Sequence, residues 1–526
     1  MALTAPLGTP AAEPPAPGRA GDDVAALVEP ALALARSWVE ATAAGESPAE
    51  KRSTGRLAAL VHDRDGVEFT LRFVDRVARP ADDAVAAREL VRLARPGADP
   101  HAVPVPAFLG PLDRAMMTAG ALVAPLAPRV VVPLARRRLR QLVGHLVQDA
   151  GGRRLARHLA AARAQGFQLN LNLLGEAVLG EAEADRRLAA TLALLQRDDV
   201  DYVSVKASSV ASQLNPWDED GSRERLVRRL LPLYAAAAAR TPHVFVNLDM
   251  EAYEDLHLTV EVFTALLSRP ELHDLQAGIV LQGYLPDALA ALEHLAAFAA
   301  ERTAAGGAPI KVRLVKGANL AMERVDAELH DWPQAPYTTK ADVDANYVRL
   351  LDAALRPERA GSLRIGVASH NLPDVALAHL LAAARGVEDA LDVEMLQGMA
   401  PAQARAVRAD VGRLVLYTPV VRPGDFDVAV SYLVRRLEEN AAPQNYLHAL
   451  FTPESPSSGT EPAAGPSPLE EQEQRFRDSV RDRWATPAEP RRTQDRARER
   501  AAGLRPVDGP FAGAPDTDPS LPANRA

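Results

Sequence analysis

Polar side chains that could do chemistry recur at the ends of short, β-branched apolar runs in the middle of the chain. They are Lys206, Asp249, Gln282, Arg313 with Lys316, Ser369 with His370 and Asn371, Glu394, and Tyr417. Singly, each has an ordinary structural explanation: Lys206 could extend its charge to solvent, and Asp249 could cap the next helix. A polar residue at the end of almost every run points to a site.

A second signal lies after the last of these runs. An apolar face at helical spacing is formed by Phe426, Val430, Leu433, Val434 and Leu437. Arg435 and Arg436 lie beside it, and Glu439 follows Arg435 by one helical turn. Two interpretations stay open: a surface ion pair worth a few tenths of a kcal/mol, or a paired-guanidinium clamp for a carboxylate.

The segment RLVKG contains two basic residues and ends at a glycine. Gly317 would let the backbone approach a bound group, and Arg313 and Lys316 would suit a phosphate or an electron-rich ring. No GxGxxG or GxxxxGK[ST] follows a strand, so neither a dinucleotide fold nor a P-loop is indicated.

The elements that must position these residues alternate between apolar runs and longer Ala/Leu-rich segments. Expected strands begin at Phe167, Asp201, His243, Gly278, Ile310, Arg364, Leu391 and Arg413. Eight βα units match a (β/α)8 barrel over residues 166–450, whose strand ends converge on one mouth where active sites form. A longer connection after Gly317 leaves room for an extra loop at DWPQAPYTTK.

The flanking regions read differently. Residues 1–21 are expected to be a disordered leader, and residues 22–165 an α-helical arm domain packed on the barrel. Residues 451–526 begin with a Pro-, Ser- and Gly-rich linker and become charged and helix-prone from about Gln472. We read the apolar stretch Ala115–Ala135, interrupted by several prolines, as buried structure and not as a membrane span.

Composition excludes several functions. The chain has 526 residues and no cysteine, so disulfides, thiolate metal sites and cysteine-linked flavin are ruled out. Its net charge of -9, with dispersed basic residues, gives no footprint for nucleic acid. No metal site is expected. The N-terminus lacks a secretory pattern, which fits a cytoplasmic protein.

Seven ordered stretches resemble the flavin-dependent proline dehydrogenases, specifically the dehydrogenase domain of the bifunctional enzymes called proline utilization A. They are VSVKAS, NLDMEAY, LQGY, RLVKGA, ASHN, EMLQGM, and YTP followed by YLVRRLEEN. The resemblance implies FAD as cofactor, L-proline as substrate and 1-pyrroline-5-carboxylate as product. It further implies a membrane quinone as electron acceptor, and is compatible with peripheral contact with the inner face of the membrane and with an oligomer.

Matched position by position, the resemblance assigns roles to individual residues. Asp249, Arg313 and Tyr417 would be catalytic, and the substrate carboxylate would be held by Lys206, Arg435 and Arg436, with Glu439 steadying the arginines. FAD would be bound by Leu248, Gln282, Arg313, Val315, Lys316, Gly317, Ala318, Thr339, Lys340, Ser369, His370 and Asn371, the last five reaching its phosphates or adenosine.

One departure from the family pattern and the chain ends complete the expectations. Asn319 and Leu320 stand where much of the family has an aromatic pair, so stacking there is missing. No DNA-binding segment precedes the arm, and PDTDPSLPANRA resembles the start of an aldehyde dehydrogenase half that is cut off, so glutamate semialdehyde oxidation is not expected of these residues. A different enzyme class also stays open: a barrel lyase or aldolase with Lys206 or Lys316 as Schiff-base amine.

Overall fold

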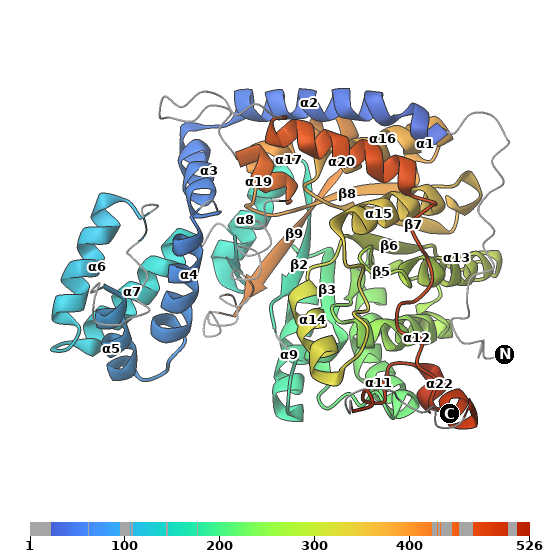
Figure 1. The fold of residues 1–526 in the computed structure, drawn as a ribbon, viewed down its shortest axis with the longest axis horizontal. Coiled ribbons are helices and arrows are strands. Elements are labelled where there is room, and N and C mark those ends of the chain that lie inside the picture. The colour runs from blue at the N-terminus through green and yellow to red at the C-terminus, as the bar shows by residue number, and fades with distance from the viewer. Residues whose placement is uncertain are drawn as a thin grey trace.

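A computed structural model describes residues 23–61, 63–94, 106, 109–143, 146–175, 177–422, 429, 432, 444–451, 466–502 and 513–525. Its centre is a closed parallel barrel flanked by helices, with a helical arm on one side (Figure 1). The expected (β/α)8 barrel preceded by a helical region is confirmed.

Eight parallel strands form the barrel. They are β2 (Phe167–Leu173), β3 (Tyr202–Lys206), β4 (Phe245–Asp249), β5 (Ala277–Gln282), β6 (Ile310–Val315), β7 (Leu363–Ala368), β8 (Leu391–Leu396) and β9 (Leu414–Val421). Neighbours in sequence pair with each other, and β9 pairs with both β8 and β2, which closes the sheet. A two-residue strand, β1 (Gln148–Asp149), adds to β9 outside the closed circle. All eight predicted strands are present.

The barrel helices cover the outer face of the sheet. They are α9 (Glu181–Leu195), α10 (Ala207–Val210), α11 (Glu219–Ala238), α12 (Leu256–Leu267), α13 (Ala288–Ala304), α14 (Leu320–His330), α15 (Lys340–Ala354), α16 (Leu372–Arg385) and α17 (Pro401–Val411), with short 3-10 turns at Tyr253–Asp255, Pro270–Leu272, Pro357–Arg359 and Glu388–Ala390. Outward strand residues and inward helix residues form one continuous core. The βα connection after β6 contains the longer loop expected there, between α14 and α15.

The arm precedes the barrel. It comprises α1 (Asp23–Ala26), α2 (Val28–Gly45), α3 (Pro48–Val61), α4 (Arg64–Phe73), a π-helix at Val74–Ala78, α5 (Asp83–Ala94), α6 (Pro111–Val123), α7 (Pro128–Val143) and α8 (Gly152–Ala164). Helix α2 lies along α16 and α17, whereas α4 to α7 stand apart from the barrel (Figure 1). Those four helices have a small core of their own, which includes Phe69, Leu90 and Val132.

The interpretation of Ala115–Ala135 as buried structure is wrong for much of the stretch. Leu122, Leu126 and Val130 are 60%, 88% and 58% exposed, because α6 and α7 pack one face on the small arm core and turn the other outward. No helix in the described ranges is long and apolar enough to cross a membrane.

Helices after the barrel return to it. They are α19 (Tyr446–Phe451), α20 (Pro468–Asp482), α21 (Arg496–Ala502) and α22 (Pro522–Arg525). Ser467 and Glu470 close a capping box at the start of α20, which packs on α15, and its Phe476 and Val480 join the main core. Helix α20 of the described C-terminal region is therefore packed on the barrel, whereas the predicted leader at residues 1–21 and the Pro-, Ser- and Gly-rich linker at residues 452–465 lie outside the described residues.

Candidate active site

A buried carboxylate at the end of β4 meets a tyrosine from the middle of β9. The Tyr417 hydroxyl donates to Asp249 Oδ2 at 3.0 Å, and Asn247 Nδ2 donates to Oδ1 at 2.7 Å. Asn172, from β2, donates to Asp249 Oδ2 at 3.3 Å and also contacts the Tyr417 hydroxyl. Asp249 accepts its bonds inside the barrel mouth and makes no helix cap, which removes the ordinary structural explanation for it.

Arg313 lies against this group from β6. Its guanidinium carbon is 4.8 Å from the centroid of the Tyr417 ring, within cation–π range. Its Nε donates to Glu394 Oε2 at 2.6 Å, so Glu394 on β8 holds the Arg313 guanidinium by an ion pair. Three residues expected to be catalytic, Asp249, Arg313 and Tyr417, are thus brought together.

Burial and neighbouring charges act in opposite directions on the pKa values of these groups. It raises the pKa of Asp249 above its usual value, although the charges of Arg313 and Lys206 and the bond from Tyr417 oppose the shift. It also raises the pKa of the Tyr417 hydroxyl, which stays protonated as a donor. Burial lowers the pKa of Arg313, but the Glu394 and Asp249 charges outweigh it, so that pKa lies above its usual value.

Lys206 reaches the same mouth from β3. The parallel register places it opposite Asp249, and its ammonium pairs with Glu251 at 2.6 Å. Gln282, at the end of β5, donates to the Glu251 carbonyl at 2.8 Å. A bound carboxylate would compete with Glu251 for Lys206.

Gly317 has a close contact that requires its residue type. Its φ is +122°, and an added Cβ would lie 2.5 Å from Cγ of Tyr284. The backbone therefore passes directly over that ring, while Ala318 is exposed next to it. Val315 is half-buried, and Leu248 is fully buried in the main core beside the β4 end.

Lys316 lies in a charged cluster between α15 and α16. Its ammonium pairs with Asp344 at 2.5 Å and with Asp374 at 2.6 Å, and Lys340 also contacts Asp344. Burial and then the Lys316 charge lower the pKa of Lys340 to about 8. Thr339 caps α15 through the Asp342 N–H at 3.1 Å.

The β7 end residues are engaged within the protein. The Leu396 N–H donates to His370 Nε2 at 3.0 Å, so Nδ1 carries the proton and donates to Gln403 Oε1 at 2.8 Å. Ser369 Oγ accepts from the Asn371 N–H at 3.0 Å, and Asn371 caps α16. Their predicted cofactor contacts stay predictions.

The predicted carboxylate clamp lies outside the described residues. Arg435, Arg436 and Glu439, with the apolar helix around them, therefore stay a prediction. Several residues bordering the site were missed in reading the sequence: Asn172, Glu251, Tyr284, Asp344 and Asp374. Asn170 and Asn172 in LNLNL did offer a signal, because two polar residues at period two on a strand share one face.

The loops behind the site are tied to the C-terminal segment. Glu323 on α14 accepts from the Tyr253 N–H at 2.7 Å and from the Tyr284 hydroxyl at 3.4 Å.

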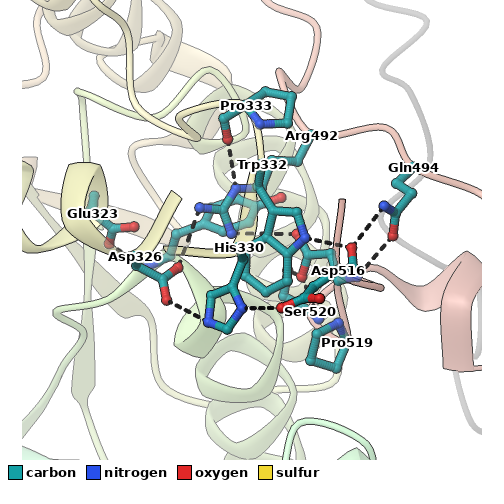
Figure 2. A network of polar contacts seen from close by, with 12 residues as sticks. Glu323, Asp326, His330, Trp332, Pro333, Arg492, Gln494, Asp516, Pro519 and Ser520 are labelled. Atoms are coloured by element: carbon teal, nitrogen blue, oxygen red, sulfur yellow. Dashed lines mark hydrogen bonds and ion pairs between the residues drawn. The ribbon is translucent and has the colours of Figure 1, made fainter. Parts of the chain in front are cut away.

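Figure 2 shows Arg492, from the C-terminal segment, next to Trp332, and the Arg492 guanidinium carbon lies 4.8 Å from the centroid of the Trp332 ring. Arg492 also donates to the Pro333 carbonyl at 2.9 Å and pairs with Asp518 at 3.4 Å.

The fold and this cluster define a (β/α)8 barrel protein with a polar site at the carboxyl ends of its strands. The profile of the family described as proline dehydrogenase matches residues 155–449, which is more than half of the chain. The chain belongs to the proline dehydrogenase family.

Known relatives agree with this assignment. The bifunctional protein PutA of Salmonella typhimurium is 25% identical over 322 residues, 58% of this chain and 24% of that protein. The solved PutA of Corynebacterium freiburgense is 53% identical, with a TM-score of 0.63, over 74% of this chain and 36% of its own. PutA of Bdellovibrio bacteriovorus, 24% identical with a TM-score of 0.70 over 95% of this chain and 47% of its own, supports the fold alone. The chain spans about a quarter of the length of the curated relative.

Proposed function

We propose that this chain oxidises L-proline to 1-pyrroline-5-carboxylate with bound FAD and passes the electrons to a quinone, as the first step from proline toward glutamate. The observation that carries the proposal is the Asp249, Tyr417 and Arg313 cluster at the strand ends of a barrel that belongs to this family. The relative named bifunctional is longer than this chain, which covers 24% of it.

The residues present fit a flavin. The amide of Gln282 and the guanidinium of Arg313 are the kinds of donors from which ring nitrogens and oxygens accept hydrogen bonds. Lys316 and Lys340 are cations of the kind that phosphates bind, although both pair here with Asp344, and Lys316 also pairs with Asp374. When bound, FAD would supply the two-electron acceptor for the reaction.

The chain's own residues would orient the substrate. The ammonium of Lys206, with the predicted pair Arg435 and Arg436, would hold the proline carboxylate and so fix the position of C5. Orientation of this kind is among the largest contributions to rate. Proline would arrive with a neutral amine and lose a hydride equivalent from C5 and the amine proton, which gives the cyclic imine. Arg313 would stabilise the negative charge that develops next to it.

The Schiff-base alternative gains no support. A Schiff-base lysine must be able to lose its proton, which requires a lowered pKa. Burial lowers the pKa of Lys316, but the charges of Asp344 and Asp374 outweigh it, so that pKa lies above its usual value. Lys206 is held by Glu251.

The test is proline-dependent reduction of an artificial electron acceptor by the purified, FAD-loaded chain. We expect saturable turnover with L-proline that falls at least about tenfold in Tyr417→Phe, which loses one hydrogen bond to Asp249. Asp352→Asn, far from the mouth on α15, serves as the control and should keep wild-type turnover. A flavin-loaded wild type without turnover would refute the proposal, and wild-type turnover in Tyr417→Phe would remove that residue from the site.

A further inference from the structure

Charged side chains fill part of the barrel interior, where such barrels usually place layers of Val, Ile and Leu. Lys311 on β6 is 1% exposed, and its ammonium pairs with Asp392 at 3.0 Å and lies in ion-pair contact with Glu394. Glu394 is fully buried and holds Arg313 with its other oxygen. Below them, Arg364 pairs with Asp392 at 2.9 Å.

These contacts form one column of alternating charge, here defined as Arg364, Asp392, Lys311, Glu394 and Arg313. It runs along β6, β7 and β8 from the floor of the barrel to the mouth. Lys311 is further enclosed by two rings, with its ammonium 5.2 Å from the centroid of Tyr202 and 5.8 Å from that of Phe245.

Stability alone gives a weak reason for such a column. Taking charges out of water costs several kcal/mol per ion, and replacing buried ion pairs with apolar residues is often neutral or stabilising. The column ends at Arg313, whose guanidinium faces Tyr417. The column therefore determines where the Arg313 guanidinium lies in the candidate active site.

Gly366 supplies an independent observation. It lies on β7 between the two charged strands, and an added Cβ would be 2.6 Å from both Glu394 Oε1 and Lys311 Cε. Its φ is not among the positive values of the chain, so the backbone does not require glycine there. The missing side chain makes room for the pair.

We propose that Glu394 is a positioning residue that fixes the guanidinium of Arg313 toward the flavin and Tyr417, and that Lys311 and Gly366 hold Glu394 in place. This inference rests on the proposed function. Glu394 touches neither substrate nor flavin, and it acts through Arg313. The carboxylate of proline is held by other residues, so Glu394 governs the reaction step and not substrate affinity.

The test is a double-mutant cycle on the FAD-loaded chain with Glu394→Gln, Arg313→Met and the double variant. Glu394→Gln removes a charge-assisted hydrogen bond, so we expect flavin reduction at saturating proline to slow about ten- to a hundredfold. The apparent proline affinity should change less than about threefold. The midpoint potential of the bound flavin should shift as well.

In the Arg313→Met background, Glu394→Gln should then change neither the rate nor the potential further. Effects that multiply, or a Glu394→Gln variant equal to wild type, would overturn the inference. Gly366→Ala, which crowds the pair without removing a charge, should slow reduction in the same direction. Asp352→Asn, a buried and ion-paired acid on the outer helix α15, is the matched control and should leave both readouts unchanged.

Two further arms keep the outcome decisive. If Glu394→Gln does not fold, Lys311→Met/Glu394→Gln removes both charges of the buried pair and replaces it in the cycle. A crystal structure of the variant without FAD should have the Arg313 guanidinium displaced from the Tyr417 ring, and an unmoved Arg313 would refute the positioning role. If the wild type fails to oxidise proline but the variant structure shows the displaced Arg313, the proposed function is refuted and the positioning role of Glu394 stands.

Discussion

Gly317→Ala should damage the site for two separable reasons. The first is the backbone, because a φ of +122° is a conformation that residues with a Cβ rarely adopt, at a cost of about 1–3 kcal/mol. The second is packing, because the new Cβ would lie 2.5–2.7 Å from three ring atoms of Tyr284. Overpacking of this kind costs about 1–3 kcal/mol.

Tyr284 cannot easily move aside. Its ring is buried, and its hydroxyl bonds to the Glu251 carbonyl and to Glu323. The strain must then be relieved by the 316–318 backbone, which is the segment proposed to pass along the flavin. Together the two costs are about 2–6 kcal/mol, a large part of the 5–15 kcal/mol that a domain usually has.

The assay is thermal unfolding together with the FAD-to-protein ratio from absorbance. We expect a lower Tm and loss of most bound FAD. Gly386→Ala is the matched control, because its φ is +66° with nothing within 4 Å of the added Cβ, so only the backbone cost of about 1–2 kcal/mol applies and FAD should remain. A Gly317→Ala protein with wild-type Tm and FAD content would refute the reasoning.

Further predictions concern charge. Burial raises the pKa of Asp287 from 3.8 to about 6. Ionisation of Asp287 therefore destabilises the fold fully above pH 6, and this penalty shrinks as the pH falls from 6 to 3.8. Asp287→Asn should stabilise the fold by about 1–3 kcal/mol at pH 8 and little at pH 4 in urea unfolding. The pKa of Lys340 is about 8, so Lys340 loses its charge above pH 8, and FAD affinity measured by flavin fluorescence should weaken there. Lys340→Gln should remove this pH dependence, and the same dependence in the variant would contradict the prediction. Arg435→Met and Arg436→Met should each lower kcat/KM for proline by about ten- to a hundredfold with FAD content unchanged, and a wild-type value would exclude that arginine as a carboxylate ligand.

Strand-end chemistry was predictable because two regularities coincide. Parallel barrel strands appear in a sequence as apolar runs, and their carboxyl ends lie at one mouth. Asp249, Arg313 and Tyr417 could therefore be assigned to one site from the sequence alone. Their hydrogen-bond partners could not be, because the meeting of Tyr417 with Asp249 depends on the closure of β9 against β2.

The charged column shows a signal that was present but unread. In IKVRLV, Lys311 and Arg313 alternate with buried apolar residues, which places both charges on the inner face. Their shared partner, Glu394, is 81 residues after Arg313 in the sequence, and only the order of the strands in the barrel brings the two together.

Other features depend on tertiary packing that composition does not encode. The apolar stretch in α6 and α7 was expected to be buried, yet Leu126 is 88% exposed, because the arm offers these helices a partner on one side only. Arg492 lies in a charged tail, and it contacts Trp332, which is distant in sequence (Figure 2). It also pairs with Asp518.

The central claim, that this barrel binds FAD and reduces it with L-proline, is tested most directly by anaerobic absorbance titration. The account predicts a yellow, FAD-loaded protein whose flavin absorbance bleaches on addition of L-proline, with one proline consumed per flavin and 1-pyrroline-5-carboxylate formed. A protein that cannot be loaded with FAD, or whose bound FAD stays oxidised in excess L-proline, would contradict it.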